Sequence, residues 1–333
     1  MDVSDYNLET LRHDAEFVLY RGLAKRPNNQ SPSRLLILAP VLERPAPETL
    51  RRMEHEFSLK EELDGDWAVR PLTLTQYQGR SMVLLEDPGG EPLDRLVREP
   101  MELEQFLRLG IRLSAAVSGL HRRGVIHKEI KPGNVLVNPS TGEVRLTGFG
   151  IATRLPRQRQ LPESPEFIAG TLPYMAPEQT GRMNRSIDSR SDLYSLGVTL
   201  YEILTGALPF SASDPIEWVH CHIARQPVAP CERRKDIPPS VSAIVMKLLA
   251  KTPEERYQTA AGVEYDLRRC LQAWESRHRI EEFPLGEHDT PDRLVIPEKL
   301  YGRREREVEM LLAAFDRVLA SGTPELVLVS GYS

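Results

Sequence analysis

Residues 121–150 read HRRGVIHKEIKPGNVLVNPSTGEVRLTGFG, and this stretch decides the fold. It places a carboxylate (Glu129), an ammonium group (Lys131) and a side-chain amide (Asn134) close together in the sequence. Farther along, Phe149 stands between two glycines, shortly after an apolar run. What these groups can do depends on the structure that the sequence builds on either side.

The sequence before this stretch predicts strands and turns with one helix. Apolar runs of strand length at residues 16–20 and 34–41 are joined by a polar, turn-rich connection, so together they predict a hairpin. Residues 47–64 predict a helix that begins near a proline. Residues 80–90 predict a buried strand that ends at Pro-Gly-Gly.

From Met101 onward the pattern favours helices. Apolar residues recur at helical spacing up to a cap at Gly124. Residues 192–205 predict a second helix, with Ser191 or Asp192 as its N-cap and Gly206 at its end. Because this helix is apolar nearly all round, we expect it to be central and buried.

Two more helices are predicted at residues 240–252 and 260–276. A mostly β first part and a mostly helical second part predict a bilobal α+β architecture. Residues 276–298 are polar, contain prolines and lack periodicity, so they predict a linker. After it, residues 300–318 predict a charged amphipathic helix and residues 325–333 a buried strand that meets a glycine.

The composition is that of an ordinary water-exposed protein with room for one large or two medium domains. Of 333 residues, 40% are hydrophobic and 27% charged, and the formal net charge is −5. This mild acidity gives no electrostatic support for nucleic acid or an anionic membrane as a partner. No apolar run approaches the ~18 residues of a membrane span, and the acidic N-terminus does not read as a secretory signal. We therefore expect a cytoplasmic protein.

Three cysteines are too few and too scattered for a disulfide framework. His220, Cys221 and His222, together with Cys231, raise the alternative of a zinc site, but their spacing matches no common zinc finger. Ordinary buried or surface thiols and histidines are the simpler interpretation.

The opening stretch closely resembles the catalytic and metal-binding loops of serine/threonine protein kinases. The family pattern is His-Arg-Asp-x-Lys-x-x-Asn followed by Asp-Phe-Gly, and this chain has His127-Lys128-Glu129-Ile130-Lys131-Pro132-Gly133-Asn134 followed by Gly148-Phe149-Gly150. Later segments resemble further kinase motifs in the same order, namely AGTLPYMAPEQ (169–179), SDLYSLGVTLYEILTGALPF (191–210) and KTPEERYQTA (251–260).

This resemblance implies the domain organisation. An N-terminal extension (1–15) precedes a kinase-like domain at residues 16–275, and the linker (276–298) follows it. Within the kinase-like domain, residues 16–87 form a β-rich N-lobe and residues 88–275 a helical C-lobe.

Residues 181–202 resemble, more narrowly, the N-terminal domain of very large bacterial signalling proteins. In those proteins a kinase-like domain precedes an AAA-type ATPase domain, sensor modules and a histidine kinase. Residues 299–333 would then be the truncated start of an α/β P-loop ATPase domain, with residues 300–315 as its first helix and Gly331 as the first glycine of its phosphate loop. The alternative is a strand followed by an ordinary turn.

For the kinase-like domain, the resemblance implies phosphoryl transfer from ATP with Mg²⁺. Glu129 takes the place of the catalytic Asp and carries its carboxylate one methylene farther out. Lys131 would neutralise charge on the transferred group, Asn134 would be a metal ligand, and Thr171 would bond the base and the lysine.

Other parts of the family's ATP machinery are missing or altered. Gly22 stands alone where a glycine-rich loop is expected, Pro40 lies about where the phosphate-binding lysine belongs, and Gly148 replaces the metal-binding Asp. Glu56 matches the glutamate that orients that lysine, and a solvated helix charge is the equal alternative. Adenine would pair with the hinge backbone at Leu85, Glu86 and Asp87.

The residues that shape the C-lobe are intact by the same comparison. Glu178 and Arg256 resemble the buried ion pair of the family, and Asp192 matches the residue that holds the catalytic-loop backbone. Gly197 matches the glycine of the buried helix.

The leading hypothesis is a pseudokinase, a regulatory or docking module of a multidomain sensor protein, in which ATP and Mg²⁺ bind weakly or not at all. Its partners would be a protein substrate or signalling protein and the C-terminal domains of the parent chain. The alternative is an active Ser/Thr kinase whose transfer depends on Glu129, Lys131 and Asn134. A third possibility, ATP-driven switching, would belong to the ATPase domain of the parent chain.

Overall fold

The computed structural model describes residues 3–26, 32–154, 170–183, 185–290, 305–324 and 326–327. The chain divides into two compact units, residues 1–290 and residues 291–333.

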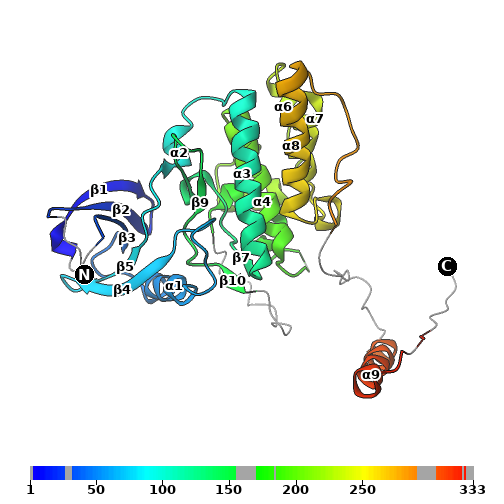
Figure 1. Ribbon diagram of the computed structural model, residues 1–333, viewed down its shortest axis with the longest axis horizontal. Coiled ribbons are helices and arrows are strands. Elements are labelled where there is room, and N and C mark those ends of the chain that lie inside the picture. Colours follow the sequence, from blue (N-terminus) through cyan, green and yellow to red (C-terminus); the bar gives the residue numbers. More distant parts are fainter. Residues whose placement is uncertain are drawn as a thin grey trace. The chain divides into compact units, whose positions relative to one another are not determined.

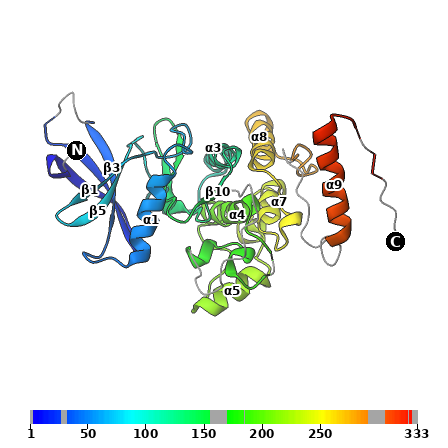
Figure 2. The same cartoon turned by 90° about the horizontal axis from the view of Figure 1, so that it is seen from below.

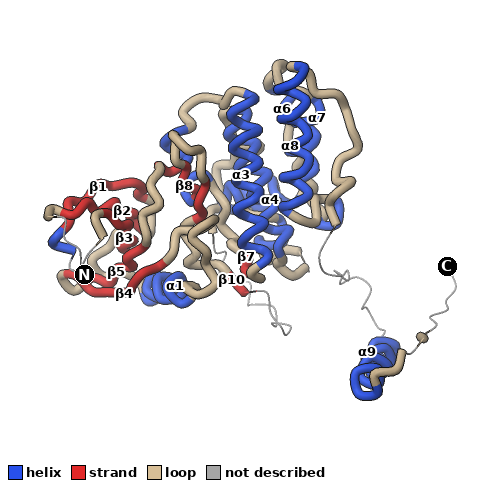
Figure 3. The backbone as a smooth tube through the Cα atoms, in the orientation of Figure 1, coloured by secondary structure: helices blue, strands red, loops and turns tan. Residues whose placement is uncertain are grey.

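The first unit begins with a five-stranded antiparallel sheet and one helix. Along the sheet the strand order is β1-β2-β3-β5-β4. Figure 3 shows these strands gathered in one lobe, and Figure 2 shows helix α1 lying beside the sheet on the side of the helical lobe. The elements are β1 (Tyr6–His13), β2 (Phe17–Ala24), β3 (Arg34–Pro40), α1 (Pro47–Ser58), β4 (Pro71–Tyr77) and β5 (Arg80–Leu85).

The predicted hairpin of β2 and β3 is confirmed, since the two strands pair antiparallel from Phe17 to Leu23. The interpretation of residues 1–15 as an extension is wrong for its described part, because Tyr6–His13 forms an edge strand of the sheet. Strand β4 was also not predicted. Most side chains of β1 are exposed and five of its eight residues are polar or charged, so its sequence lacks the apolar run of a buried strand.

One face of the sheet packs against α1. Leu36 and Leu38 of β3 lie in a buried cluster with Met53 of α1 and with Leu19 of β2. Residues that face each other across two antiparallel strands point to the same side, so Leu19, which pairs with Leu38, faces α1 as well. The predicted helix at 47–64 is shorter than expected and ends at Ser58.

The helical lobe is built around a buried helix, α4, which Figure 2 shows between α3 and α5. All but a few of its side chains are buried, as predicted. The helices of this lobe are α2 (Leu93–Leu96), α3 (Leu103–Arg122), α4 (Ser189–Thr205), α5 (Pro215–Ile223), α6 (Pro230–Arg233), α7 (Pro239–Leu248) and α8 (Ala260–Arg277).

The predicted ends of the two main helices are largely confirmed. Gly124 follows α3 with φ +73° and donates its N–H to the carbonyl of His121. Gly206 ends α4 in a left-handed conformation. The start of α4 differs from the prediction, because Asp188, rather than Ser191 or Asp192, accepts the capping hydrogen bond.

Short strands connect the helices and position the opening stretch. Strands β6, β8 and β9 form one small sheet, and β7 and β10 form another. The loop from His127 to Asn134 runs between β7 and β8, and Gly148 follows β9. The strands are β6 (Glu91–Pro92), β7 (Val125–Ile126), β8 (Val135–Val137), β9 (Val144–Leu146) and β10 (Thr153–Arg154).

Residues 279–290 form a C-terminal strap on the helical lobe rather than the first half of the predicted linker. Ile280 is buried, and Phe283 and Leu285 pack against the core of the helical lobe. In Figure 1 this orange segment leaves α8 and runs back beside the helices. Polarity and prolines led to the linker prediction, but three apolar residues at irregular spacing are enough to hold the segment down.

The second unit contains helix α9 (Glu305–Ser321), which overlaps the amphipathic helix predicted at residues 300–318 and ends three residues later. The strand predicted at 325–333 falls almost entirely outside the described residues. No helix among the described residues is long and apolar enough to span a membrane.

Candidate functional site

The catalytic-loop segment is anchored by Asp192 of α4. Its two carboxylate oxygens accept hydrogen bonds from the backbone N–H groups of His127 and Lys128, each at 2.8 Å. One of these oxygens also lies 2.8 Å from Nε2 of His121. Asp192 is fully buried, so these donors replace the water that its carboxylate loses. The predicted role of Asp192 as the anchor of this loop is confirmed.

Three predicted catalytic residues meet beside this loop. Nζ of Lys131 donates to Oε1 of Glu129 at 2.9 Å and to Oγ1 of Thr171 at 2.6 Å. The hydroxyl of Thr171 donates to the same Glu129 oxygen at 2.7 Å. Thr171 lies in residues 170–179, which match the end of the activation segment of kinases. A closed triangle of hydrogen bonds therefore joins this segment to the loop. The catalytic roles of these residues remain predictions.

The triangle keeps Glu129 ionised. Burial acts to raise the pKa of this carboxyl, but the ammonium group of Lys131 and the hydroxyl of Thr171 lower it more, so the pKa lies below its usual value. A carboxylate of this kind can accept a hydroxyl proton as a weak general base.

Asn134 is buried next to the triangle, and both ends of its amide are engaged. Nδ2 donates to the backbone carbonyl of Glu129 at 2.8 Å. Oδ1 accepts a short hydrogen bond from Nη1 of Arg12, which also donates to the carbonyl of Gly133 at 2.9 Å. The oxygen that the family resemblance assigns to a metal ion therefore faces a guanidinium group.

Arg12 reaches this position from strand β1 of the sheet. It pairs with Leu19 across β1 and β2, which places its side chain on the face that carries Leu38. Only 8% of the side chain is exposed. Arg12 was not predicted as a site residue, because a single arginine in a polar segment gives no signal until the segment is known to be a strand.

The turn between β1 and β2 contains carboxylates where the family resemblance predicts glycines. Oδ1 of Asp14 accepts hydrogen bonds from the N–H groups of Glu16 and Phe17, at 2.9 and 2.7 Å. Oδ2 of Asp14 lies 3.6 Å from Nε of Arg12, and Glu16 pairs with Arg52 of α1 at 2.6 Å. Gly22 was predicted to lie in a loop between the strands at residues 16–20 and 34–41. It lies within β2 instead.

Glu56 of α1 is buried, so the interpretation of this residue as a solvated helix charge is wrong. Its carboxylate accepts hydrogen bonds from the backbone N–H groups of Phe149 and Gly148. Burial raises its pKa to about 7, although Arg12 and these N–H groups oppose the rise. Glu56 thus holds the Gly-Phe-Gly turn. The cation whose charge acts on its carboxylate is Arg12, rather than a lysine of β3.

Strand β3 carries no lysine, and its inward side chains are apolar. Pro40 is the last residue of the strand and pairs with Phe17, while its carbonyl accepts a short hydrogen bond from Arg80. Lys25 does not substitute for the missing lysine, because its ammonium group donates to the carbonyl of Ser4 at an exposed position.

Gly148 has φ +82°, a conformation that residues with a side chain rarely adopt. A Cβ at this position would lie 2.6 Å from Oδ1 of Asn134. Phe149 is buried with its ring 4.7 Å from the ring of His127. The turn therefore keeps the packing of the family motif without its metal-binding carboxylate.

The predicted hinge is crossed by a second arginine. Leu85 is buried and pairs with Leu36, and the side chain of Asp87 is fully buried. Nε of Arg21, on β2, donates to Asp87 at 2.9 Å, and its Nη1 pairs with Glu91 at 2.8 Å. Arg21 pairs with Leu36 across β2 and β3, so it extends from the same face of the sheet as Arg12.

Glu86 lies beside these contacts, with its backbone N–H donated to the carbonyl of Arg70 at 2.9 Å. The adenine-binding role of the hinge at Leu85, Glu86 and Asp87 remains a prediction.

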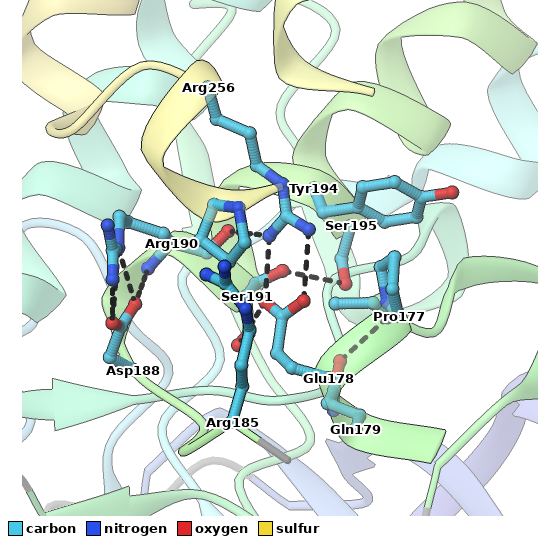
Figure 4. Close-up of polar contacts among 12 residues, drawn as sticks. Pro177, Glu178, Gln179, Arg185, Asp188, Arg190, Ser191, Tyr194, Ser195 and Arg256 are labelled. Atoms are coloured by element: carbon cyan, nitrogen blue, oxygen red, sulfur yellow. Dashed lines mark hydrogen bonds and ion pairs between the residues drawn. The ribbon is translucent and has the colours of Figure 1, made fainter. Parts of the chain in front are cut away.

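The predicted ion pair of Glu178 and Arg256 is confirmed. The guanidinium contacts both carboxylate oxygens, at 2.7 and 2.9 Å, and neither side chain is more than 1% exposed. Ser191 adds a hydrogen bond to Glu178 at 2.7 Å, and Arg256 also donates to the carbonyl of Arg190. Figure 4 shows this network joining the end of the activation segment to the start of α4.

Each ring nitrogen of His222 has a hydrogen-bond partner within the protein. Nδ1 lies 3.0 Å from the hydroxyl of Tyr194, and Nε2 lies 2.8 Å from the carbonyl of Leu172. Burial lowers its pKa to about 4. Cys221 is buried beside it, and the described residues contain no cluster of three or more His, Cys, Asp or Glu residues arranged to hold a metal.

Comparison with known proteins places this site in a family. The chain is 36% identical to the serine/threonine-protein kinase PknB of Mycobacterium leprae over 187 residues, which is 56% of this chain and 29% of that protein. It is 40% identical to PknB of Mycolicibacterium smegmatis over 152 residues, 46% of this chain and 24% of that protein. It is also 28% identical over 320 residues to hybrid signal transduction histidine kinase G of Dictyostelium discoideum, 70% of this chain and 9% of that protein.

The chain thus spans less than a third of the length of each of these three relatives. The family model of the protein kinase domain matches residues 41–267, which is more than half of the chain and covers α1, β4 and β5 of the β-rich lobe and most of the helical lobe. The bilobal arrangement, the anchored catalytic loop and the Glu178–Arg256 pair agree with that match. This chain belongs to the protein kinase domain family.

Proposed function

We propose that this kinase domain is a regulatory or docking module of a signal-transduction protein, with impaired phosphoryl transfer. The observation that carries the proposal is the contact between Arg12 and the side-chain oxygen of Asn134. In the family that oxygen would face Mg²⁺. Here a group with a permanent positive charge, held by a strand of the other lobe, faces it instead.

The surrounding residues do not fit a metal–nucleotide complex. Mg²⁺ prefers oxygen ligands in near-ideal octahedral geometry, and Gly148 supplies no side-chain oxygen. The carboxylates of Asp14 and Glu16 occupy the turn that would cover the phosphates, and like charges repel at this range. Strand β3 also lacks the lysine that binds the phosphates in the family pattern.

The second candidate is an active Ser/Thr kinase. The hydrogen-bonded triangle of Glu129, Lys131 and Thr171 favours it, because these groups are already in place to accept a substrate proton and to neutralise a transferred phosphoryl group. In this alternative Arg12 would leave Asn134 and serve as the phosphate-binding cation near Glu56.

A thermal-shift assay with ATP, with and without Mg²⁺, separates the two candidates, and a radiolabelled transfer assay on a general protein substrate accompanies it. The wild type is compared with Arg12→Met, which keeps an unbranched apolar stem but removes the guanidinium group and its charge. Arg108→Met is the matched control, since Arg108 pairs with Glu104 and Glu275 on an exposed helix surface.

We expect no Mg²⁺-dependent shift and no transfer for the wild type, and the same result for Arg108→Met. A clear Mg²⁺-dependent shift of the wild type, together with transfer that Asn134→Ala abolishes, would overturn the proposal in favour of an active kinase. Loss of that transfer in Arg12→Met would further assign Arg12 to the phosphates.

We also propose that residues 299–333 begin a separate ATPase domain of a larger sensor protein. The sequence resemblance supports this, as does the composition of α9, whose described apolar side chains include Met310, Phe315 and Leu319, each at least 60% exposed. An amphipathic helix gains most of its stability by packing its apolar face. The test is the parent gene, which should continue from Gly331 into the rest of a Gly-x-x-x-x-Gly-Lys-Ser/Thr motif.

A further inference from the structure

The C-terminal strap is held to the helical lobe by specific polar contacts as well as by its apolar residues. Ser240 of α7 donates to the carbonyl of Glu281 at 2.9 Å. The guanidinium of Arg269 on α8 lies over the ring of Phe283, 4.2 Å from its centroid, and pairs with Glu287 at 3.1 Å. The strap therefore has a defined path along α7 and α8.

The strap ends on the loop that precedes α8. Asp289 accepts three hydrogen bonds there, from the backbone N–H groups of Gln258 and Thr259 and from the Thr259 hydroxyl, at 2.6, 2.8 and 2.8 Å. A Cβ on Gly262, in the first turn of α8, would lie 2.5 Å from the Asp289 carboxylate. A carboxylate at a helix N-terminus is favoured by the free N–H groups and by the helix dipole.

A second carboxylate joins the strap to the same loop. Asp266 of α8 is buried, and its Oδ2 accepts hydrogen bonds from the hydroxyl of Tyr257 at 2.6 Å and from the N–H of Gly286 at 2.8 Å. Gly286 has φ +79°, so the strap turns at a position that favours glycine. Two carboxylates thus fix the strap and residues 257–259 to each other.

Arg256 belongs to this loop, directly before Tyr257. Its guanidinium holds Glu178, and the side-chain oxygen of Gln258 accepts a hydrogen bond from Arg190, which supports the same network. Gln258, which Asp289 holds, is therefore two residues along the chain from Arg256 and its contact with Glu178. Asp289 itself touches no residue of 170–180 among the described contacts.

We propose that the strap couples the chain beyond Thr290 to the end of the activation segment, with Asp289 as a positioning residue for the Arg256–Glu178 pair. Tension or docking that lifts the strap removes Asp289 and Gly286 from the loop and loosens the support of Glu178. A signal can reach residues 172–180 in this way whether or not the domain transfers phosphate.

Hydrogen–deuterium exchange of the whole chain tests the coupling. The variant is Asp289→Ala and the readout is exchange in residues 172–180, where N–H groups of Tyr174, Met175 and Gln179 are hydrogen-bonded. The matched control is Asn138→Ala. Oδ1 of Asn138 also accepts two backbone N–H groups and a hydroxyl, in the loop between β8 and β9.

We expect Asp289→Ala to speed exchange in residues 172–180 by about tenfold at matched global stability, and Asn138→Ala to leave it unchanged. If Asp289→Ala proves too unstable to measure, Asp289→Asn keeps one acceptor and should give a smaller increase in the same segment. Unchanged exchange in this segment for the folded Asp289 variant, or an equal increase in the Asn138 control, would overturn the coupling.

Discussion

Arg256 and Glu178 show how much one side chain can matter when its charge is buried. Replacing Arg256 by Met leaves the Glu178 carboxylate without a cation in a site with no exposed surface. We expect this variant to lose about 3–5 kcal/mol of unfolding free energy, measured by urea denaturation.

The surface pair of Arg108 and Glu104 is the comparison, because both side chains are about half exposed. Arg108→Met should cost far less, because water screens an exposed ion pair. Equal losses of unfolding free energy in the two variants would show that burial adds nothing to the contribution of the Arg256–Glu178 pair.

Single residues also show what the sequence can and cannot predict. Glu129, Lys131, Thr171 and Asn134 were predicted by motif, and the structure brings them together. Arg12 was not predicted, because its contact with Asn134 joins positions that lie far apart in the sequence. A motif records local spacing, whereas such a contact depends on how the two lobes pack.

Helices α4 and α7 meet at Gly197, so adding one methyl group there, as in Gly197→Ala, tests how closely they pack. Alanine normally stabilises a helix interior by up to about 1 kcal/mol relative to glycine. A Cβ on Gly197, however, would lie 2.6 Å from Cβ of Leu248, so α7 must move. We expect Gly197→Ala to destabilise the protein by about 1–3 kcal/mol in urea denaturation.

Gly110→Ala in α3 provides a graded control. Its nearest neighbour would be the end of the Leu267 side chain at 3.1 Å, which can give way more easily than a Cβ atom. A cost for Gly110→Ala equal to or above that of Gly197→Ala would contradict the close packing of α4 on α7.

The elements that the sequence predicted well are those with strong periodicity, such as α3 and α4. Strand β1 and the C-terminal strap were misassigned for a common physical reason. Each is held by a few long-range contacts rather than by an apolar pattern of its own, Tyr6–His13 through pairing with β2 and the strap through Ile280 and Asp289. The pairing and capping partners of such segments are set by the fold as a whole.

The stability of the first unit should depend on pH through two buried groups of opposite effect. Glu56, with a pKa of about 7, retains a proton that the unfolded chain releases near 4.5, so its contribution falls as pH rises from about 4.5 to 7. His222, with a pKa of about 4, stays neutral while the unfolded imidazole gains a proton below about 6.5, so its contribution falls as pH drops from about 6.5 to 4. Each effect amounts to about 3 kcal/mol, and they largely cancel between pH 4.5 and 6.5.

Variants of the two groups separate these effects in urea denaturation across that pH range. Glu56→Gln keeps an acceptor for the N–H groups of Gly148 and Phe149, and its stability should rise more steeply with pH than that of the wild type. His222→Gln should show the opposite change in slope. Slopes identical to the wild type in both variants would contradict the assigned protonation states.

At the level of the whole domain, the two lobes are joined across the cleft by arginines from one sheet face. Arg12 reaches the catalytic loop and Arg21 reaches the segment after the hinge. Glu56 adds a third link, from α1 to the Gly-Phe-Gly turn. The protein has the contacts that shape a kinase domain, and two arginines lie against residues for which the family resemblance predicts metal binding and adenine binding, Asn134 and Asp87.

The most direct measurement is a Mn²⁺ titration in the presence of ATP, with the free ion followed by electron paramagnetic resonance. Because Arg12 engages the Asn134 oxygen, the wild-type protein should remove no more Mn²⁺ from solution than ATP does alone. Saturable, protein-dependent loss of the free-ion signal that disappears in Asn134→Ala would contradict the replacement of the metal by Arg12.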